Sequence, residues 1–284
     1  MAKRKNVLLK LGGSIVTYKG STNFPLSPKG IWDNATRFMN TEVVRRICQE
    51  IKTCLPNLGY LIVVHGAGIF GHFPVSSFLE VDPLEQRLVG WPLTLYSVQL
   101  ENTIFMNEML SSGIPAVSIP PHSLFTVTSR DTERPWVGID ALFDCPRLER
   151  LVEHYTPVLF GDIVFDQNGD ASVLSGDTIL YLCARELKDV DLVIAGTDVQ
   201  GIFTDDPKKN SRAKLVETIT LSEKDKFSPR ESSSLDVDGG MGRKFKELMS
   251  IARLGIPSMV INALQEGNIL KALRGEKVGT SILP

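Results

Sequence analysis

The chain has 284 residues, of which 43% are hydrophobic and 23% charged, so it is long enough to bury a substantial globular core. Its 31 basic and 33 acidic residues give a formal net charge of -2, which argues against a protein whose main function is to coat nucleic acid or an anionic membrane. No apolar run reaches the roughly 20 residues that span a bilayer. Lys10 and the glycines after it interrupt the apolar stretch that a signal peptide would need near the N-terminus. We therefore expect a cytoplasmic protein that binds neither nucleic acid nor membranes.

The spacing of cysteines and histidines predicts no metal site built from protein side chains. The four cysteines, at positions 48, 54, 145 and 183, contain no CxxC pair, and the histidines are equally scattered. We expect reduced and mostly buried thiols.

Continuous apolar runs, typical of strands in a parallel sheet that is covered on both faces, alternate with helical patterns along the chain. The expected strands are Val7–Leu11, Tyr60–Val64, Ile114–Ile119, Pro157–Phe165, Asp191–Gly196 and Ser258–Asn262. Helices are expected at 43–51, 142–155, 177–187 and 241–252. The turn-forming residues 166–170 predict a hairpin between Val164 and Val173.

This alternation predicts an α/β fold, with one open, largely parallel sheet sandwiched between helices. We expect a single domain over residues 1–284. A polar seam near 165–175 predicts two lobes, about 1–168 and about 169–284.

Four glycine-containing junctions follow expected strands or begin expected helices, where open α/β sheets bind ligands. The first runs from Lys10 to Ser14 and combines a lysine with Gly12 and Gly13, whose backbone N–H groups can approach an anion. The sequence fits neither GxGxxG nor GxxxxGK[ST], and a plain tight turn is an equally good interpretation. The second, HGAGIFGH at 65–72, follows a buried strand and suggests another anion cradle that ends in His72. Taken alone, a glycine-rich turn with a solvated histidine explains it better.

The third and fourth junctions each begin an expected helix. In SGD at 175–177, either Ser175 or Asp177 could simply cap the helix. In DGGMGRK at 238–244, a glycine pair places Lys244 just past the first helical turn, where both the helix N-terminus and the ammonium favour phosphate. A surface helix whose lysine faces water is an equally good interpretation of this spacing.

Taken together, the four junctions indicate a function more specifically than any one of them does alone. Two lysines, two glycine cradles and one carboxylate suit phosphoryl transfer between two anionic partners, which depends mainly on positioning and charge neutralisation. An acceptor that is already an anion needs no general base, and none is evident beside these loops.

Six motifs carry a family resemblance. KLGGS, HGAGxFGH, GD at 161–162, SGD at 175–177, TDVxGI at 197–202 and DGGMxxK at 238–244 resemble, in this order, the amino acid kinase superfamily. The histidine that ends the second motif and the segment from IPAVSI through HSL are similar to the isopentenyl phosphate kinases. The resemblance implies ATP-dependent phosphorylation of isopentenyl phosphate to isopentenyl diphosphate with Mg²⁺, in a homodimer. It also implies that the first lobe binds the acceptor and the second binds the nucleotide.

The resemblance also assigns roles to residues that match the family's motifs. Lys10 and Lys244 are expected to contact the ATP phosphates and the transferring group, Asp177 to hold them by ion pairs, and His72 to hydrogen-bond the acceptor phosphate. The expected nucleotide contacts are Lys10, Gly12, Gly13, Ser14, Lys19, Gly68, Asp198, Phe203, Asp206, Lys208, Gly240 and Lys244. The expected acceptor contacts are Ala67, Gly71, His72 and Gly161.

The acceptor remains open at this point, because a phosphonate kinase of the fosfomycin type also uses a glycine loop that ends in histidine. An apolar slot beside His72 would favour a prenyl tail, and segment 90–96 with the helix carrying Val98, Phe105 and Met109 could supply it. Such a stripe is more often plain core. A catalytically silent nucleotide-binding module is disfavoured by Lys10, Asp177 and Lys244, and an NAD-dependent oxidoreductase by the missing GxGxxG.

Overall fold

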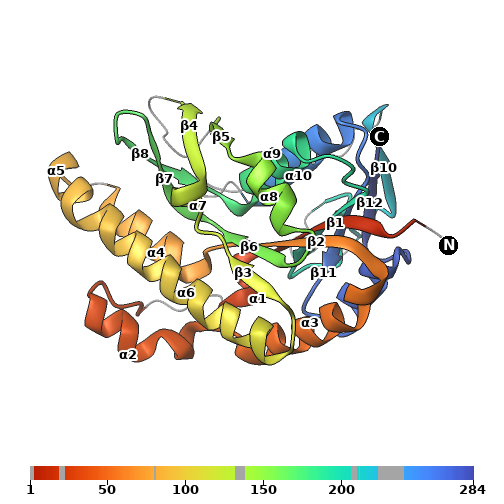
Figure 1. The fold of residues 1–284 in the computed structure, drawn as a ribbon, viewed down its shortest axis with the longest axis horizontal. Helices are drawn as coiled ribbons and strands as arrows, with labels where there is room; N and C mark the ends of the chain where they lie inside the picture. The colour runs from red at the N-terminus through yellow and green to blue at the C-terminus, as the bar shows by residue number, and fades with distance from the viewer. Residues whose placement is uncertain are drawn as a thin grey trace.

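The computed structural model of this chain describes residues 3–18, 23–79, 81–131, 138–205, 210, 212–222 and 240–284. These residues build a main sheet of eight strands in the order β10-β12-β11-β9-β1-β2-β6-β3 (Figure 1). In chain order the strands are β1 Lys5–Leu11, β2 Leu58–His65, β3 Ala116–Ser118, β6 Thr156–Phe160, β9 Leu192–Thr197, β10 Thr218–Thr220, β11 Ser258–Asn262 and β12 Thr280–Leu283.

Neighbouring strands of the main sheet run parallel except β11 and β12, which are antiparallel. The largely parallel sheet predicted from the sequence is therefore confirmed. Because β1, β2, β6 and β9 run in one direction, their carboxyl ends meet at one edge, where ligands bind in such folds.

Helices cover both faces of this sheet (Figure 1). One face packs against α3 Thr41–Cys54, α4 Gly68–Phe78, α6 Trp91–Ser111 and α11 Asn268–Arg274, and the other against α8 Cys145–Leu151, α9 Gly176–Glu186 and α10 Gly240–Arg253. Side chains of a strand alternate between faces, so Leu9 and Leu11 of β1 join the first core and Leu8 the second. Lys10 has the parity of Leu8, and its side chain therefore points toward α9 and α10.

A second, four-stranded sheet has the order β5-β4-β7-β8. Its strands are β4 Phe125–Ser129, β5 Asp140–Phe143, β7 Asp162–Asp166 and β8 Ala171–Leu174. The predicted hairpin is confirmed, since β7 and β8 pair antiparallel. Asp166 Oδ1 closes its turn by accepting hydrogen bonds from the backbone N–H groups of Asn168 at 2.8 Å and Asp170 at 2.9 Å.

Two expected elements were wrong in their bounds. The single strand expected at 157–165 is two strands, β6 and β7, which lie in different sheets. Gly161 separates them and donates its backbone N–H to the His65 carbonyl oxygen at 3.0 Å, at the edge of the main sheet. The helix expected at 142–155 is strand β5 followed by α8, because Asp144 caps α8 by accepting a hydrogen bond from the Arg147 backbone N–H at 3.0 Å.

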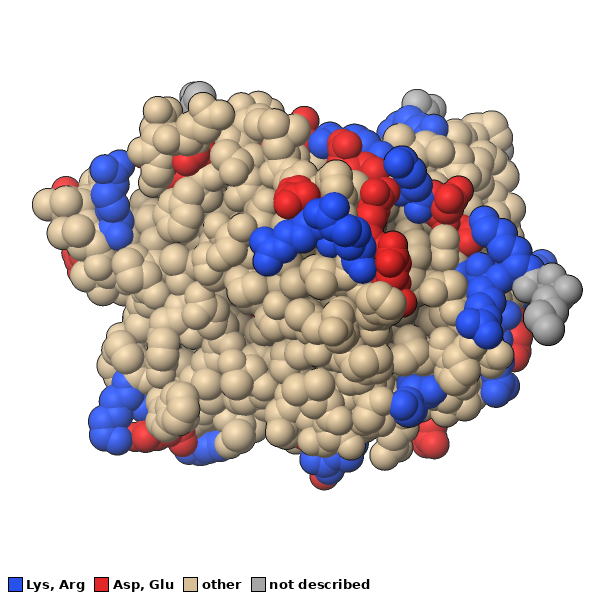
Figure 2. Space-filling view, viewed as in Figure 1, with Lys and Arg blue, Asp and Glu red and all other residues tan. Residues whose placement is uncertain are grey.

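The remaining helices are shorter or lie at the periphery. They are α1 Gly13–Val16, α2 Pro28–Phe38, α5 Pro83–Glu85 and α7 Pro121–Leu124, with a 3₁₀ turn Leu55–Asn57 and a π turn Gln86–Gly90. None of the described helices is long and apolar enough to cross a bilayer. On the face shown in Figure 2, basic and acidic side chains of the described residues lie side by side and do not form a surface of one sign.

Candidate active site

A buried cluster of three charged side chains lies at the edge where the parallel strands end. Lys10 Nζ lies 2.5 Å from Asp177 Oδ2, and Lys244 Nζ donates to Asp177 Oδ1 at 2.8 Å. Lys10 comes from the end of β1, Asp177 from the first turn of α9 and Lys244 from the second turn of α10. Their exposed fractions are 5%, 9% and 8%. The three residues are 67 or more positions apart in the chain, yet they form the ion pairs that the family resemblance implied.

The charges of this cluster shift the pKa values of its members. Burial lowers the pKa of Lys10 to about 8, the Asp177 carboxylate opposes this, and the charge of Lys244 adds to it. Burial alone would raise the pKa of Asp177, but the two ammonium groups outweigh burial and hold this pKa below its ordinary value of 3.8. At neutral pH the cluster therefore carries two positive charges and one negative charge. The surplus positive charge, held away from water, favours a bound anion.

The start of α9 is capped by a different residue from the one that pairs with the lysines. Ser175 Oγ accepts the backbone N–H of Thr178 at 3.2 Å, which leaves Asp177 to the ion pairs. Arg243 strengthens this junction by donating to Ser175 Oγ at 2.7 Å and to Thr178 Oγ1 at 3.0 Å. Sequence reasoning gave no such role to Arg243; its only signal was its position beside Lys244.

A second carboxyl group lies near the cluster on α10. Burial raises the pKa of Glu247 to about 7, the Asp177 charge adds to this, and Arg243 opposes it. Thr178 Oγ1 lies 3.5 Å from Glu247 Oε1. Glu247 is thus partly protonated near neutral pH and adds less than a full negative charge to this region.

The first two glycine junctions pack directly against each other. Gly12 donates its N–H to the Gly196 carbonyl oxygen and Gly66 to that of Leu11, both at 2.9 Å. A Cβ atom on Gly13 would lie 2.6 Å from the Cα and N atoms of Gly68, so neither loop has space there for a side chain. The glycines bring the ends of β1 and β2 close together beside Lys10, and Ser14 follows inside α1.

The residues expected to bind the acceptor include several that line a cavity beside Lys10. Lys10, Gly13, Ala67, Gly71, His72 and Gly161 all line it. His72 lies on the second turn of α4 and is half-buried. Lysine and histidine therefore line the same cavity, together with glycines of the two loops.

The rest of the cavity wall is mostly apolar. It comes from α4, α6 and the β7–β8 hairpin, through Val75, Thr94, Val98, Ile163 and Val173. The apolar slot considered in the sequence is thus formed in part by α6. Phe105 and Met109 do not belong to it, because both are fully buried in the core beneath the main sheet.

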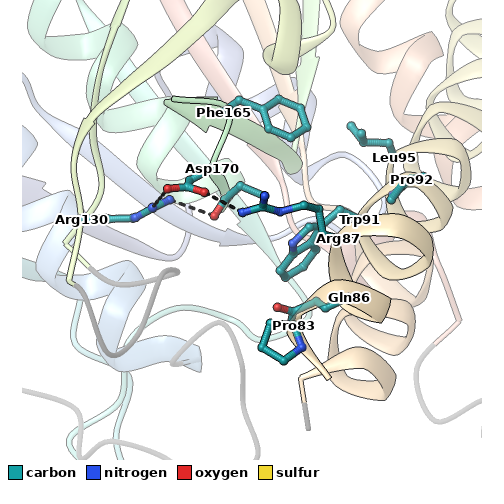
Figure 3. Close-up of a pocket in the computed structure, with 11 residues that line it drawn as sticks. Pro83, Gln86, Arg87, Trp91, Pro92, Leu95, Arg130, Phe165 and Asp170 are labelled. Atoms are coloured by element: carbon teal, nitrogen blue, oxygen red, sulfur yellow. Dashed lines mark hydrogen bonds and ion pairs between the residues drawn. The ribbon is translucent and has the colours of Figure 1, made fainter. Parts of the chain in front are cut away.

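The segment 90–96 also contributes to a larger pocket of about 350 Å³ with a different lining (Figure 3). Trp91, Pro92 and Leu95 line it, and Asp170 lies between Arg87 at 3.1 Å and Arg130 at 3.5 Å. We place the chemistry in the smaller cavity, because only that cavity contains Lys10 and His72.

Several expected nucleotide contacts lie outside this cavity. Asp198 follows β9 at the same edge of the sheet, and Phe203 is half-buried and forms a β-bridge with Leu215. Gly240 begins α10. Their contacts with nucleotide remain predictions. Three further expected contacts, Lys19, Asp206 and Lys208, lie outside the described residues.

Metal ligands are not assembled in the described part of the chain, where no three His, Cys, Asp or Glu side chains could hold an ion. One hydrogen-bonded side-chain pair beside the cavity was missed. His122 Nδ1 lies 2.7 Å from Oδ2 of Asp162, which lines the cavity and is 2% exposed. The GD motif at 161–162 was its only sequence signal, and a motif says nothing about a partner 40 residues away.

Comparison with known proteins gives a family match. A family model described as "Amino acid kinase family" matches residues 5–262. The chain belongs to the amino acid kinase family. This confirms the superfamily indicated by the motifs.

Within the amino acid kinase family, the chain is similar to proteins with two acceptors. It is 34% identical to an isopentenyl phosphate kinase of Methanothermobacter thermautotrophicus, over 97% of this chain and 98% of that protein. It is 37% identical to a uridylate kinase of Thermotoga petrophila, over 98% of this chain and 99% of that protein. The X-ray structure of an isopentenyl phosphate kinase superposes with a TM-score of 0.75 at 31% identity, covering 97% of this chain and 99% of that chain.

Proposed function

We propose that this chain is an isopentenyl phosphate kinase, which transfers the γ-phosphoryl group of ATP to isopentenyl phosphate and releases isopentenyl diphosphate and ADP. One observation carries the proposal. The cavity that contains Lys10 at one side contains His72 at another, and its remaining wall is largely apolar. The similarity to isopentenyl phosphate kinases in sequence and structure supports this choice of acceptor.

The donor side of the reaction rests on the charged cluster. In the transfer, a phosphate oxygen of the acceptor forms a bond to the γ-phosphorus, and the bond from that phosphorus to the β–γ bridging oxygen breaks. Negative charge builds on the bridging oxygen and spreads over the moving group. Lys10 and Lys244, fixed by Asp177, neutralise this charge without having to reorganise.

The acceptor side rests on His72 and the glycine loop. A phosphate monoester already carries the attacking anionic oxygen, so no group has to remove a proton. His72 donates a hydrogen bond to the acceptor phosphate and holds it in line with the γ-phosphorus. The backbone at 66–68 lets the phosphate approach closely because glycine occupies both ends of that turn.

The apolar wall distinguishes a prenyl phosphate from a polar acceptor. Val75, Val98, Ile163 and Val173 offer a hydrocarbon tail an apolar surface, and each CH₂ group buried there contributes about 0.8 kcal/mol. A phosphonate with polar substituents would gain nothing from these contacts. This wall therefore favours isopentenyl phosphate over an acceptor of the fosfomycin type.

Several features implied by the resemblance are part of the proposal. Mg²⁺ is proposed to arrive with the ATP phosphates, since it is commonly held by substrate phosphates and water with few protein ligands. Bound there, it adds positive charge to the triphosphate. A cytoplasmic homodimer, with an acceptor lobe at about 1–168 and a nucleotide lobe at about 169–284, completes the proposal.

His72→Ala should raise the KM for isopentenyl phosphate by about 10- to 100-fold and also lower kcat, because a hydrogen bond to a charged group contributes roughly 1.5–3 kcal/mol. The KM for ATP should stay within about twofold, since the donor phosphates contact the lysines. His154→Ala, at an exposed histidine that does not line the cavity, serves as the matched control. Equal increases in both KM values would contradict the role of His72.

The acceptor itself is tested by initial rates with Mg-ATP over a panel. The panel contains isopentenyl, dimethylallyl and geranyl phosphates, fosfomycin and uridine monophosphate. We expect the highest kcat/KM with isopentenyl phosphate. A higher value with fosfomycin or uridine monophosphate would overturn the proposed acceptor.

A further inference from the structure

Asp162 is a buried acidic residue in the wall of the cavity that contains Lys10 and His72. It begins β7, between Gly161 and Ile163, which both line the cavity. The residue as a whole is 2% exposed and its side chain 0%, so Asp162 meets the cavity with its backbone. Side chains alternate along a strand, and Ile163 packs with Val75 on the cavity side. The carboxyl group of Asp162 therefore points away from the cavity.

His122 holds this carboxyl group from behind the cavity wall. His122 Nδ1 lies 2.7 Å from Asp162 Oδ2, and the backbone N–H of His122 donates to the same oxygen at 3.2 Å. The backbone N–H of Ile163 donates to Asp162 Oδ1 at 2.9 Å. Two lone pairs would repel each other at 2.7 Å, so one hydrogen lies between Nδ1 and Oδ2. Because both carboxyl oxygens accept backbone N–H groups, the ionised carboxylate is favoured and Nδ1 is the donor.

His122 lies on a segment that is itself fixed at both ends. It belongs to the short helix α7, 40 positions before Asp162 in the chain. Just before α7, the backbone N–H of Ile119 donates to the Val158 carbonyl oxygen of β6 at 2.9 Å. Just after α7, β4 pairs with the far end of β7 through Thr126 and Phe165. His122 therefore has a firm support from which to hold the start of β7.

The start of β7 also determines where Gly161 lies. The backbone N–H of Gly161 donates to the His65 carbonyl oxygen at 3.0 Å, and the next residue is the one that His122 holds. A Cβ atom on Gly161 would lie 3.3 Å from the Ala67 backbone nitrogen, so Gly161 packs closely against the turn before α4. A shift of Asp162 would therefore move both Gly161 and Ile163 within the cavity wall.

We propose that His122 is a positioning residue, which through its hydrogen bond to Asp162 holds Gly161 and Ile163 in place against the acceptor. His122 is not among the described residues that line the cavity, so it acts through Asp162. The kinetic part of this inference rests on the proposed function, whereas the coupling between His122 and Asp162 does not.

Two variants of His122 separate hydrogen-bond donation from the filling of space. His122→Leu removes the Nδ1–H donor and keeps much of the bulk, whereas His122→Asn keeps an N–H donor close to the position of Nδ1. We expect His122→Leu to raise the acceptor KM by roughly 5- to 20-fold, of the order that one hydrogen bond contributes. The KM for ATP should stay within about twofold. His122→Asn should restore the acceptor KM to within about twofold of the wild-type value.

Asp162→Ala tests whether His122 acts through this carboxyl group. Once Asp162 is replaced, His122→Leu should raise the acceptor KM no further, since the two residues contribute through one contact. Chemical denaturation of the wild type, both single variants and the double variant should show the same non-additivity in the free energy of unfolding, without any substrate. Additive effects in these two measurements would overturn the inference.

Arg185→Met is the matched control for a side-chain pair in the same small sheet. Asp140, which begins β5, accepts the Ala141 backbone N–H at 2.9 Å and pairs with Arg185 at 2.9 Å. Neither Asp140 nor Arg185 is among the described residues that line the cavity. This variant should leave the acceptor KM unchanged, even where it lowers thermal stability.

The kinetic comparison uses whichever acceptor the wild-type protein phosphorylates with the highest kcat/KM. A wild-type acceptor KM in His122→Leu would overturn the inference and show a pair that only stabilises the fold. An equal increase in the KM for ATP, or the same increase of the acceptor KM in Arg185→Met, would also overturn it. A wild-type protein without activity toward isopentenyl phosphate would instead overturn the proposed function.

Discussion

Replacing either buried lysine by methionine should reduce kcat by about 100- to 1,000-fold, while the protein remains folded. Methionine keeps most of the length of Lys10 or Lys244 and removes the ammonium, so the loss reports charge and not volume. One preorganised contact to developing negative charge typically contributes about 2.7–4 kcal/mol to lowering a barrier. The measurement is the steady-state rate with Mg-ATP and isopentenyl phosphate, with circular dichroism as the check of folding.

Lys246→Met is the matched control, because Lys246 lies on α10 two residues from Lys244 and is exposed. It should retain wild-type kcat. The double variant Lys10→Met with Lys244→Met should lose less than the product of the two single losses, since both lysines stabilise the same charge. Full activity in either single variant would contradict the mechanism proposed here.

Asp177→Asn should lower the free energy of unfolding by roughly 3–5 kcal/mol, because it leaves two buried ammonium groups without their counter-charge. The asparagine side chain is nearly isosteric with aspartate, so the loss is electrostatic. The native carboxylate has a lowered pKa, and its contribution is present above the ordinary pKa of 3.8 and lost as the pH falls below it. We therefore expect a large difference between wild type and variant at pH 7 and a smaller one near pH 3.

Chemical denaturation at both pH values measures this difference. Asp191→Asn is the control, because Asp191 is a more exposed carboxylate that pairs with Lys3 at 2.9 Å. Its replacement should cost no more than about 1 kcal/mol, as is typical of surface ion pairs. Equal stability of wild type and Asp177→Asn at pH 7 would show that the two lysines are not held by this carboxylate.

The parts of the fold that the sequence predicted well are those governed by local pattern. β11 has the bounds expected, and β1, β2 and β9 differ from expectation by a few residues, because continuous apolar runs reliably mark strands buried on both faces. The same pattern could not divide 157–165 into two strands. That division depends on where Gly161 meets His65, which is a tertiary contact.

In the site, too, the motifs identified residues but did not determine how exposed their side chains are. Lys10, Asp177 and Lys244 were identified by the family resemblance of their motifs, and these motifs lie at strand ends and helix starts, which converge at one edge of a parallel sheet. The spacing alone left open whether Lys244 faces water, and the structure places it in the cluster at 8% exposure.

The apolar wall of the cavity was predicted only in part. Val98 was named from the sequence together with Phe105 and Met109, yet only Val98 reaches the cavity. All three are apolar residues of one helix, and periodicity cannot tell which of them points to a core and which to a cavity. Ile163 and Val173 come from the hairpin, whose position over α6 follows from the second sheet.

The most direct test of the central claim is a crystal structure with a non-hydrolysable ATP analogue, Mg²⁺ and isopentenyl phosphate bound together. The account predicts the γ-phosphate within hydrogen-bond distance of both Lys10 and Lys244, the acceptor phosphate beside His72, and the prenyl tail against Val98 and Ile163. A triphosphate bound away from both lysines, or an acceptor phosphate that does not contact His72, would contradict it.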